Sequence, residues 1–256
     1  MQGLEIRLFP CLSDNYGVLI HDSQSNLTAS IDAPEEEAVE TALQENGWTL
    51  THILVTHHHA DHTQGIAGLK AKYGCTVVGP RAEADKIPGI DESLGEGDTY
   101  AFGRFEAKIF DTPGHTSGHI SWWFPEPSVV FAGDTLFALG CGRVFEGSME
   151  EMWTSLEKLG RLPRETLLYC GHEYTQANAK FALTIEPDNI HLQARAGEID
   201  RKRANGEPTI PSSIGAELQS NPFLRADRDE VKMAVGMPNA SAADVFAEIR
   251  GRKDRF

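Results

Sequence analysis

The chain has 256 residues, with 38 acidic against 23 basic side chains and a formal net charge of −15. This excess of negative charge argues against general binding to nucleic acids or to anionic membranes. No apolar run is long enough to span a bilayer, and the start of the chain lacks the basic segment and apolar run of a secretory signal. The four cysteines are scattered without a C-x-x-C pair, so we expect buried thiols in a cytoplasmic protein.

The first two thirds of the chain predict a mixed α/β domain. Short apolar or alternating runs indicate strands at residues 4–8, 17–20, 29–32, 53–55, 76–78, 105–111, 119–124, 128–132 and 166–170. Apolar residues at helical spacing predict helices at residues 35–46, 66–73 and 149–159. Residues 81–98 contain Pro88 and several glycines, and we expect them to form a loop.

The pattern changes after residue 171. Helical spacing predicts helices at residues 174–184, 189–204 and 241–252, and Ser241 is a plausible N-cap of the last one. No alternating strand is expected in this part of the chain. We therefore predict an α/β domain at residues 1–171 and a helical domain at residues 172–256.

Residues 56–62, T-H-H-H-A-D-H, directly follow the buried strand at residues 53–55. Histidine is the commonest protein ligand of transition metals, and carboxylates join it in zinc, iron and manganese sites. If the chain stays extended beyond Thr56, His57 and His59 point to one side, because strand side chains alternate. Asp61 and His62 then lie at the turn into the next helix. The segment can thus present two ligand clusters to two neighbouring cations.

Three other strands end in a similar way, with a small residue before a histidine or aspartate. His115 follows T-P-G, Asp134 follows F-A-G and His172 follows Y-C-G. Strand ends cluster at one edge of a layered α/β protein, so these side chains are expected to converge. One such residue alone is more often a turn or capping group, but four such places together predict a metal site.

The ordered motifs resemble those of the metallo-β-lactamase superfamily: T-H-H-H-A-D-H at 56–62, T-P-G-H-T at 112–116, G-D-T at 133–135 and G-H-E-Y at 171–174. The closer resemblance is to its glyoxalase II family, the hydroxyacylglutathione hydrolases, and it covers nearly the whole chain. It includes C-G-R at 141–143, N-P-F-L-R at 221–225 and R-G-R-K-D at 250–254. The resemblance implies a metal-binding catalytic domain with the αββα sandwich fold, followed by a helical domain that binds glutathione.

The resemblance also implies the ligands of two divalent metal ions. They are His57, His59 and His115 for one ion, Asp61, His62 and His172 for the second, and Asp134 as the bridge. Zinc is expected, with iron and manganese as alternatives, because nitrogen and oxygen ligands without thiolate suit all three metals. A hydroxide shared by the two ions would attack a thioester carbonyl, since metal binding lowers the pKa of water to about 7. Asp61 and Asp134 would be the catalytic residues beside it.

The activity implied is hydrolysis of S-(2-hydroxyacyl)glutathione, such as S-lactoylglutathione, to a 2-hydroxy acid (D-lactate) and glutathione. This is the second step of methylglyoxal detoxification. The anionic substrate would contact Arg143, Tyr174, Arg250 and Lys253. The chain departs from the family pattern at Arg143, where many relatives have lysine, and at Phe145, where many have tyrosine, so one hydroxyl contact is lost or replaced by water. We expect a monomer without nucleic-acid or membrane partners.

Two other functions fit parts of the pattern. A persulfide dioxygenase of the same fold uses one iron and needs fewer ligands, so His62, His172 and the helical tail argue against it. A non-catalytic metal-binding module is disfavoured by the intact ligand set.

The remaining histidines have no ligand role in this interpretation. We expect His21, His52 and His191 to be structural or surface residues, and His119 to pack against or support the ligands. Asp32 can either support the site or simply cap the end of its strand.

Overall fold

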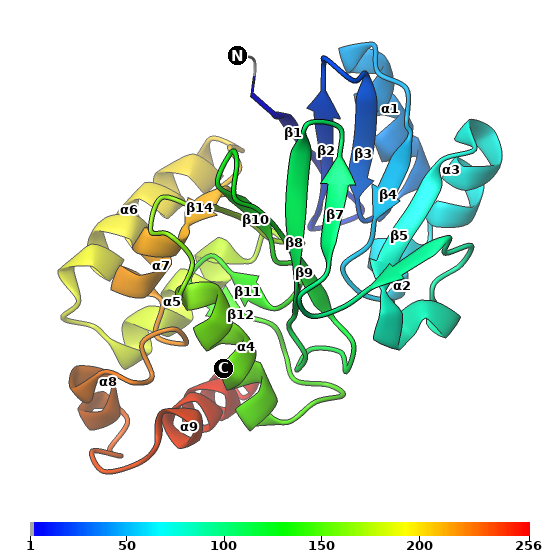
Figure 1. Cartoon of the computed structure of the whole chain (residues 1–256). Coiled ribbons are helices and arrows are strands. Elements are labelled where there is room, and N and C mark those ends of the chain that lie inside the picture. Colours follow the sequence, from blue (N-terminus) through cyan, green and yellow to red (C-terminus); the bar gives the residue numbers. More distant parts are fainter. Residues whose placement is uncertain (1–2) are drawn as a thin grey trace. The chain divides into compact units, whose positions relative to one another are not determined.

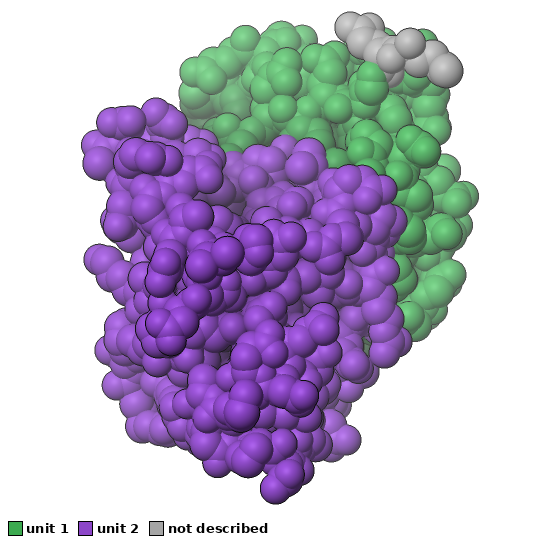
Figure 2. Space-filling model, turned by 90° about the vertical axis from the view of Figure 1, so that its left-hand side faces the viewer, with its two compact units in different colours: residues 1–111, 116–133 green, residues 112–115, 134–256 purple. Residues whose placement is uncertain are grey.

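The protein is described by a computed structural model in which residues 3–256 are placed (Figure 1). The chain divides into two compact units, coloured in Figure 2. Unit 1 comprises Met1–Asp111 and Thr116–Gly133, and unit 2 comprises Thr112–His115 and Asp134–Phe256. Within residues 3–256, no helix is both long enough and apolar enough to cross a lipid bilayer.

Unit 1 contains a six-stranded sheet in the order β1 to β6. Its strands are β1 (Glu5–Cys11), β2 (Asn15–Asp22), β3 (Leu27–Ile31), β4 (His52–Leu54), β5 (Thr76–Pro80) and β6 (Glu92–Leu94). The pairs β1–β2 and β2–β3 are antiparallel, and β3 to β6 run parallel. The helices that connect these strands are α1 (Glu36–Asn46), α2 (Ala60–Thr63), α3 (Ile66–Tyr73) and the 3-10 helix η1 (Arg81–Lys86).

Helices α1 and α3 pack beside each other against this sheet (Figure 1). The buried side chains of α1 are Val39, Ala42 and Leu43, which recur at helical spacing and so form one apolar face. The helix ends at Gly47, whose φ of 67° lies in the left-handed region that glycine adopts most easily. The resulting core includes Ile53 and surrounds β4, the strand that leads into the predicted ligand segment.

The second sheet of unit 1 is antiparallel and contains β7 (Thr99–Phe102), β8 (Phe105–Asp111), β9 (Ile120–Phe124) and β10 (Val129–Phe131). Two contacts tie it to the first sheet. The indole N–H of Trp122 donates to the carbonyl of Val55 at 3.0 Å, and Arg104 binds the buried carboxylate of Asp22. The first of these contacts fixes the backbone just before the histidine run.

Unit 2 is mainly helical. Its elements are β11 (Leu136–Phe137), β12 (Gly140–Cys141), α4 (Met149–Gly160), β13 (Leu167–Tyr169), α5 (Thr175–Ile185), α6 (Ile190–Ala204), β14 (Ser212–Ser213), α7 (Ile214–Ser220), α8 (Asp229–Ala234) and α9 (Ala242–Asp254). The pairs β11–β12 and β13–β14 are antiparallel. Helix α5 packs on α6, and α4 packs on α9, where the rings of Trp153 and Phe246 lie 6.2 Å apart.

The predicted helices are present, with ends that differ by one or two residues in most cases. The hydroxyl of Ser241 accepts a hydrogen bond from Asp244 N, which confirms it as the N-cap of α9. The loop predicted for residues 81–98 is wrong, because η1 and β6 lie there. No alternating strand was expected after residue 171, and the two-residue strand β14, which pairs with β13, has no such pattern. Strands β6 and β14 are both too short to give an alternating pattern, and the domain boundary at residue 171 stays a prediction.

Candidate metal and substrate site

In unit 1, the segment between β4 and α2 carries His57, His59, Asp61 and His62. The Nε2 atom of His57 lies 3.2 Å from Nδ1 of His59, and Nε2 of His62 lies 3.6 Å from Oδ2 of Asp61. Two ligand atoms at zinc bond lengths in tetrahedral geometry are about 3.4 Å apart. Each pair therefore has the spacing of two ligands on one metal ion. The segment itself does not continue the strand before it, since β4 ends at Leu54.

Asp32 orients His62 from the end of β3. Its Oδ2 accepts hydrogen bonds from His62 Nδ1 and from Thr56 Oγ1, both at 2.8 Å, and its Oδ1 accepts from Thr56 N at 2.7 Å. A carboxylate oxygen only accepts, so Nδ1 of His62 carries the hydrogen and Nε2 presents its lone pair to a metal. Of the two roles considered for Asp32, the structure therefore favours support of the site.

Two further supporting residues, Asn15 and Glu83, were missed in the sequence. Asn15 Nδ2 donates to Oδ2 of Asp61 at 3.1 Å. The buried carboxylate of Glu83 accepts from His58 N at 2.8 Å and from Gly118 N at 2.9 Å. Asn15 is the first residue of β2 and Glu83 lies in the segment predicted as a loop, and no motif distinguishes either residue from its neighbours.

In unit 2, His115, Asp134 and His172 are buried side by side. Oδ2 of Asp134 lies 3.4 Å from Nε2 of His115 and 3.3 Å from Nε2 of His172. The carbonyl of Arg143 accepts from Nδ1 of His115 at 2.8 Å, so the lone pair of this imidazole is also on Nε2. An aspartate between two imidazoles has the arrangement expected of a ligand shared by two ions.

The predicted substrate contacts all lie in unit 2. The ring of Tyr174 is stacked on His172, with centroids 4.6 Å apart and an interplanar angle of 3°, and the residue is 36% exposed. Arg143 and Arg250 both bind Oδ1 of Asp254, at 3.3 and 2.9 Å. These contacts place a guanidinium pair around one carboxylate.

Arg250 and Lys253 lie on one face of α9. Arg250 is only 5% exposed and donates to the carbonyl of Cys141 at 3.0 Å. Its Nε is buried and has no hydrogen-bond partner among residues 3–256. Lys253 lies over the ring of Phe181 and donates to Ala177 O. Burial, and then the nearby charge of Arg250, lower the pKa of Lys253.

Phe145, one of the two expected departures from the family pattern, is 60% exposed. Its ring lies 5.4 Å from that of His115, and the guanidinium of Arg143 lies 5.8 Å from its centroid. A tyrosine at this position would carry its hydroxyl on an exposed ring.

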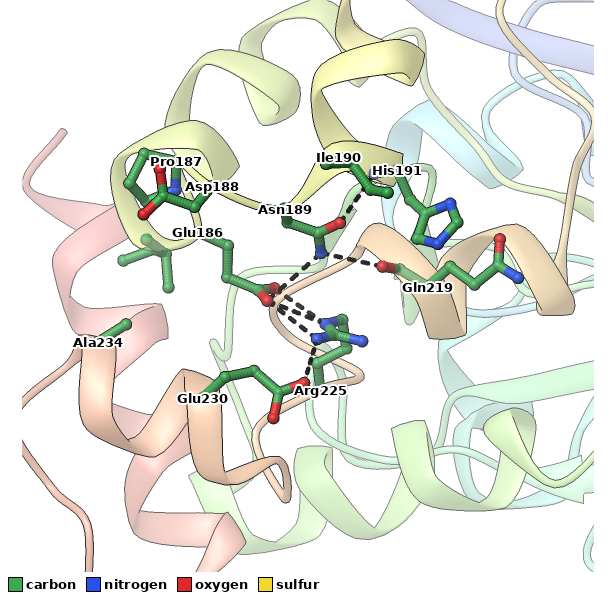
Figure 3. A pocket seen from close by; sticks show the side chains of 11 residues that line it. Glu186, Pro187, Asp188, Asn189, Ile190, His191, Gln219, Arg225, Glu230 and Ala234 are labelled. Atoms are coloured by element: carbon green, nitrogen blue, oxygen red, sulfur yellow. Dashed lines mark hydrogen bonds and ion pairs between the residues drawn. The ribbon is translucent and has the colours of Figure 1, made fainter.

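The remaining histidines are structural or lie at the surface. His21 is buried and stacked on Trp48 with centroids 4.5 Å apart, and His52 packs edge-on to Phe102. His119 is buried and stacked on the predicted ligand His57, with ring centroids 4.9 Å apart. His191 is exposed at a cavity of about 510 Å³ in unit 2 (Figure 3). None of the predicted ligands or substrate contacts lines this cavity.

Comparisons with known proteins agree with this site. Residues 27–172 match the family model of the metallo-beta-lactamase superfamily, and residues 173–256 match that of the hydroxyacylglutathione hydrolase C-terminus. A hydroxyacylglutathione hydrolase from Brucella anthropi is 56% identical over 253 residues, which cover 99% of this chain and 97% of that protein. The chain belongs to the hydroxyacylglutathione hydrolase family. This confirms the resemblance found in the motifs, the α/β fold class with a helical C-terminal part, and the expectation of a hydrolase.

Solved structures of other proteins show the same fold. The crystal structure of ETHE1 from Myxococcus xanthus has a TM-score of 0.67 at 28% identity, over 97% of this chain and 98% of that one. TTHA1623, solved in a di-iron-bound form, has a TM-score of 0.62 at 23% identity, over 85% of this chain and 98% of that one. Membership of the superfamily, together with the histidine and aspartate groups, indicates a divalent metal site.

Proposed function

We propose that the chain hydrolyses S-(2-hydroxyacyl)glutathione thioesters, with S-lactoylglutathione giving D-lactate and glutathione. This reaction would be the second step of methylglyoxal detoxification in the cytoplasm, carried out by a monomer. The main support is the complete set of thiolate-free ligands in a chain that is 56% identical to a hydroxyacylglutathione hydrolase over nearly its whole length.

The proposal assigns two divalent ions to the ligands, with zinc expected and iron or manganese as alternatives. His57, His59 and His115 would hold the first, Asp61, His62 and His172 the second, and Asp134 would bind both. When bound, such ions lower the pKa of a water molecule to about 7 and polarise the carbonyl that it attacks. The donor set fits, because His62 and His115 each have Nδ1 held by an oxygen acceptor and Nε2 left as the ligand atom.

Asp61 and Asp134 are the proposed catalytic residues. Asn15 holds Oδ2 of Asp61 at 3.1 Å, so the carboxylate has a fixed orientation in which it can accept a hydrogen bond from the attacking water. Asp134 lies between His115 and His172 and fixes their mutual distance. Because no protein nucleophile is required, the buried thiols of the chain have no part in the reaction.

For the substrate, we propose contacts with Arg143, Tyr174, Arg250 and Lys253. The three cationic side chains would neutralise the carboxylates of glutathione, and the stacked ring of Tyr174 would pack against its backbone. These contacts would also explain how a protein with a net charge of −15 binds an anion.

The test combines elemental analysis with a thioester assay. We expect the purified protein to contain close to two metal ions per chain and to release free thiol from S-lactoylglutathione. Activity should disappear on chelation and return on addition of zinc. Full activity after complete metal removal would contradict the proposal. Oxygen consumption with glutathione persulfide, in place of thioester hydrolysis, would favour the dioxygenase instead.

A further inference from the structure

The β11–β12 hairpin in unit 2 connects a predicted metal ligand with a predicted substrate contact. Asp134 lies two residues before β11, and Arg143 lies two residues after β12. At the tip of the hairpin, Leu139 has a φ of 57°, which is unusual for a residue with a large side chain. The residue is also completely buried. The surroundings must therefore stabilise this conformation.

Side chains from the helical part of unit 2 bind the backbone of the hairpin. Asn178 on α5 donates to Ala138 O at 3.1 Å, and Asn221, after α7, donates to Gly140 O at 3.0 Å. Glu217 on α7 accepts the hydrogen bond of Leu139 N at 2.8 Å. The turn is thus held by acceptors and donors that lie far from it in the sequence.

Glu217 is the centre of this group of contacts and is completely buried. One carboxylate oxygen accepts from Leu139 N and Asn221 Nδ2, and the other accepts from Arg195 Nη2 at 2.6 Å and from the hydroxyl of Ser212. A buried ion pair is seldom the most stabilising choice for a protein core. Here the pair instead fixes the orientation of the carboxylate that binds the hairpin.

The other end of the hairpin fixes the metal ligands of unit 2. Gly142 N donates to Thr135 O at 3.2 Å, which closes the chain between Asp134 and Arg143. The Arg143 carbonyl in turn accepts from His115 Nδ1 at 2.8 Å. A change at the tip of the hairpin is therefore transmitted both to the carboxylate of Asp134 and to the ring of His115.

We propose that Glu217 is a positioning residue for the metal centre, which it reaches through the β11–β12 hairpin. The inference rests on the proposed function only in taking Asp134 and His115 as metal ligands. Glu217 itself touches neither metal nor substrate. Its carboxylate holds Leu139 in the left-handed conformation, and the hairpin then sets the distance between Asp134 and His115.

The test compares E217Q with a matched control, E186Q. Glutamine keeps the size of Glu217 but must direct its amide NH₂ either at Leu139 N or at Arg195, where a donor meets a donor. Glu186 is also a buried carboxylate of unit 2 paired with an arginine, since Arg225 donates to both of its oxygens at 3.0–3.1 Å (Figure 3). Its other side-chain partner is Asn189, not the hairpin.

Three readouts separate positioning from general destabilisation. They are the zinc affinity of each protein, the visible spectrum after cobalt(II) substitution, and kcat and KM for S-lactoylglutathione. We expect E217Q to lose zinc affinity about 10-fold, as is typical when a residue that orients a ligand is removed. Its cobalt spectrum should change and its kcat should fall, whereas E186Q should match the wild type in all three readouts.

The zinc and cobalt measurements need no substrate, so they separate this inference from the proposed function. A wild type that binds metal but cleaves no thioester would refute the function alone. An E217Q protein with the zinc affinity and cobalt spectrum of E186Q would refute the positioning role. If E217Q does not fold, E217D takes its place, because the shorter side chain keeps the charge beside Arg195 but cannot also reach Leu139 N. E217D should shift the cobalt spectrum in the same sense, and an unchanged spectrum would refute the role.

Discussion

Replacing Asp32 by asparagine should weaken metal binding without disturbing the backbone. Asparagine has almost the same shape and tolerates the φ of 56° that Asp32 adopts. Its amide oxygen can still accept from Thr56 N, but its NH₂ group then faces Nδ1 of His62, where the carboxylate accepted a hydrogen bond at 2.8 Å. To avoid two opposed donors, the imidazole must move its hydrogen to Nε2, the atom that would bind the metal.

The size of the effect follows from this change of tautomer. Loss of a partner that orients a metal-bound histidine costs 10- to 100-fold in affinity, which equals about 1.4–2.8 kcal/mol. If the amide turns over, its oxygen faces His62 but its NH₂ faces the N–H of Thr56. That orientation leaves a buried donor unsatisfied at a cost of about 1–3 kcal/mol, so neither arrangement restores the wild type.

Zinc affinity of the metal-free protein can be measured by competition with a chromophoric chelator. The matched control is D22N, since Asp22 is another buried aspartate of unit 1, held by Arg104 and Ser25. We expect D22N to bind zinc like the wild type. An equal loss of affinity in both variants, or wild-type affinity in D32N, would refute the reasoning.

Three further predictions concern stability, substrate affinity and thiol chemistry. D22N should lower the free energy of unfolding by about 2 kcal/mol in urea titrations. Burial by itself raises the pKa of Asp22, but the hydrogen bonds from Arg104 and Ser25 outweigh this effect, so the pKa is lowered overall. The stabilisation by Asp22 should therefore be complete above the unfolded pKa of about 3.9 and vanish as the pH falls through the lower folded pKa. A difference in unfolding free energy between the wild type and D22N that grows in acid would contradict this. F145Y should lower KM for S-lactoylglutathione about two- to fivefold at constant kcat, as one added hydrogen bond allows, and an unchanged KM would remove this position from the substrate site. Burial raises the pKa of Cys11 and Cys170 to about 12, so the folded protein should resist a thiol reagent at neutral pH, whereas rapid labelling would contradict the burial.

The ligand segments could be predicted from the sequence because each is a local pattern. A short apolar strand, a small residue and then a histidine or aspartate occur within a few positions of one another, as at Gly133-Asp134 and Gly171-His172. The structure accordingly brings three of the predicted ligands together in unit 2 and pairs the other four in unit 1. Local sequence carries this information because strand ends determine where the side chains that follow them lie.

The residues that hold the ligands could not be predicted, because their contacts are long-range. Asn15 and Asp61 are 46 residues apart, and Glu83 and His58 are 25 residues apart. Glu217 lies 78 residues from Leu139. Such pairs form only after the sheet and helices have packed, and hydrophobic periodicity does not specify which polar side chain will face which backbone group. The short strands β6 and β14 were not predicted for a related reason. They are strands because they pair with β5 and β13, and they are too short to show an alternating sequence pattern.

The excursion of Thr112–His115 into unit 2 means that no single cut of the chain can yield the two units as separate fragments. A fragment that ends at residue 171 keeps His115, Asp134 and the β11–β12 hairpin. It lacks Asn178, Glu217 and Arg250, which all bind the backbone of that hairpin. The helical tail thus holds the backbone of this hairpin, in addition to the substrate contacts proposed for it. Grafting a different tail onto the first 171 residues would have to recreate those contacts with the hairpin before it could change what the enzyme accepts.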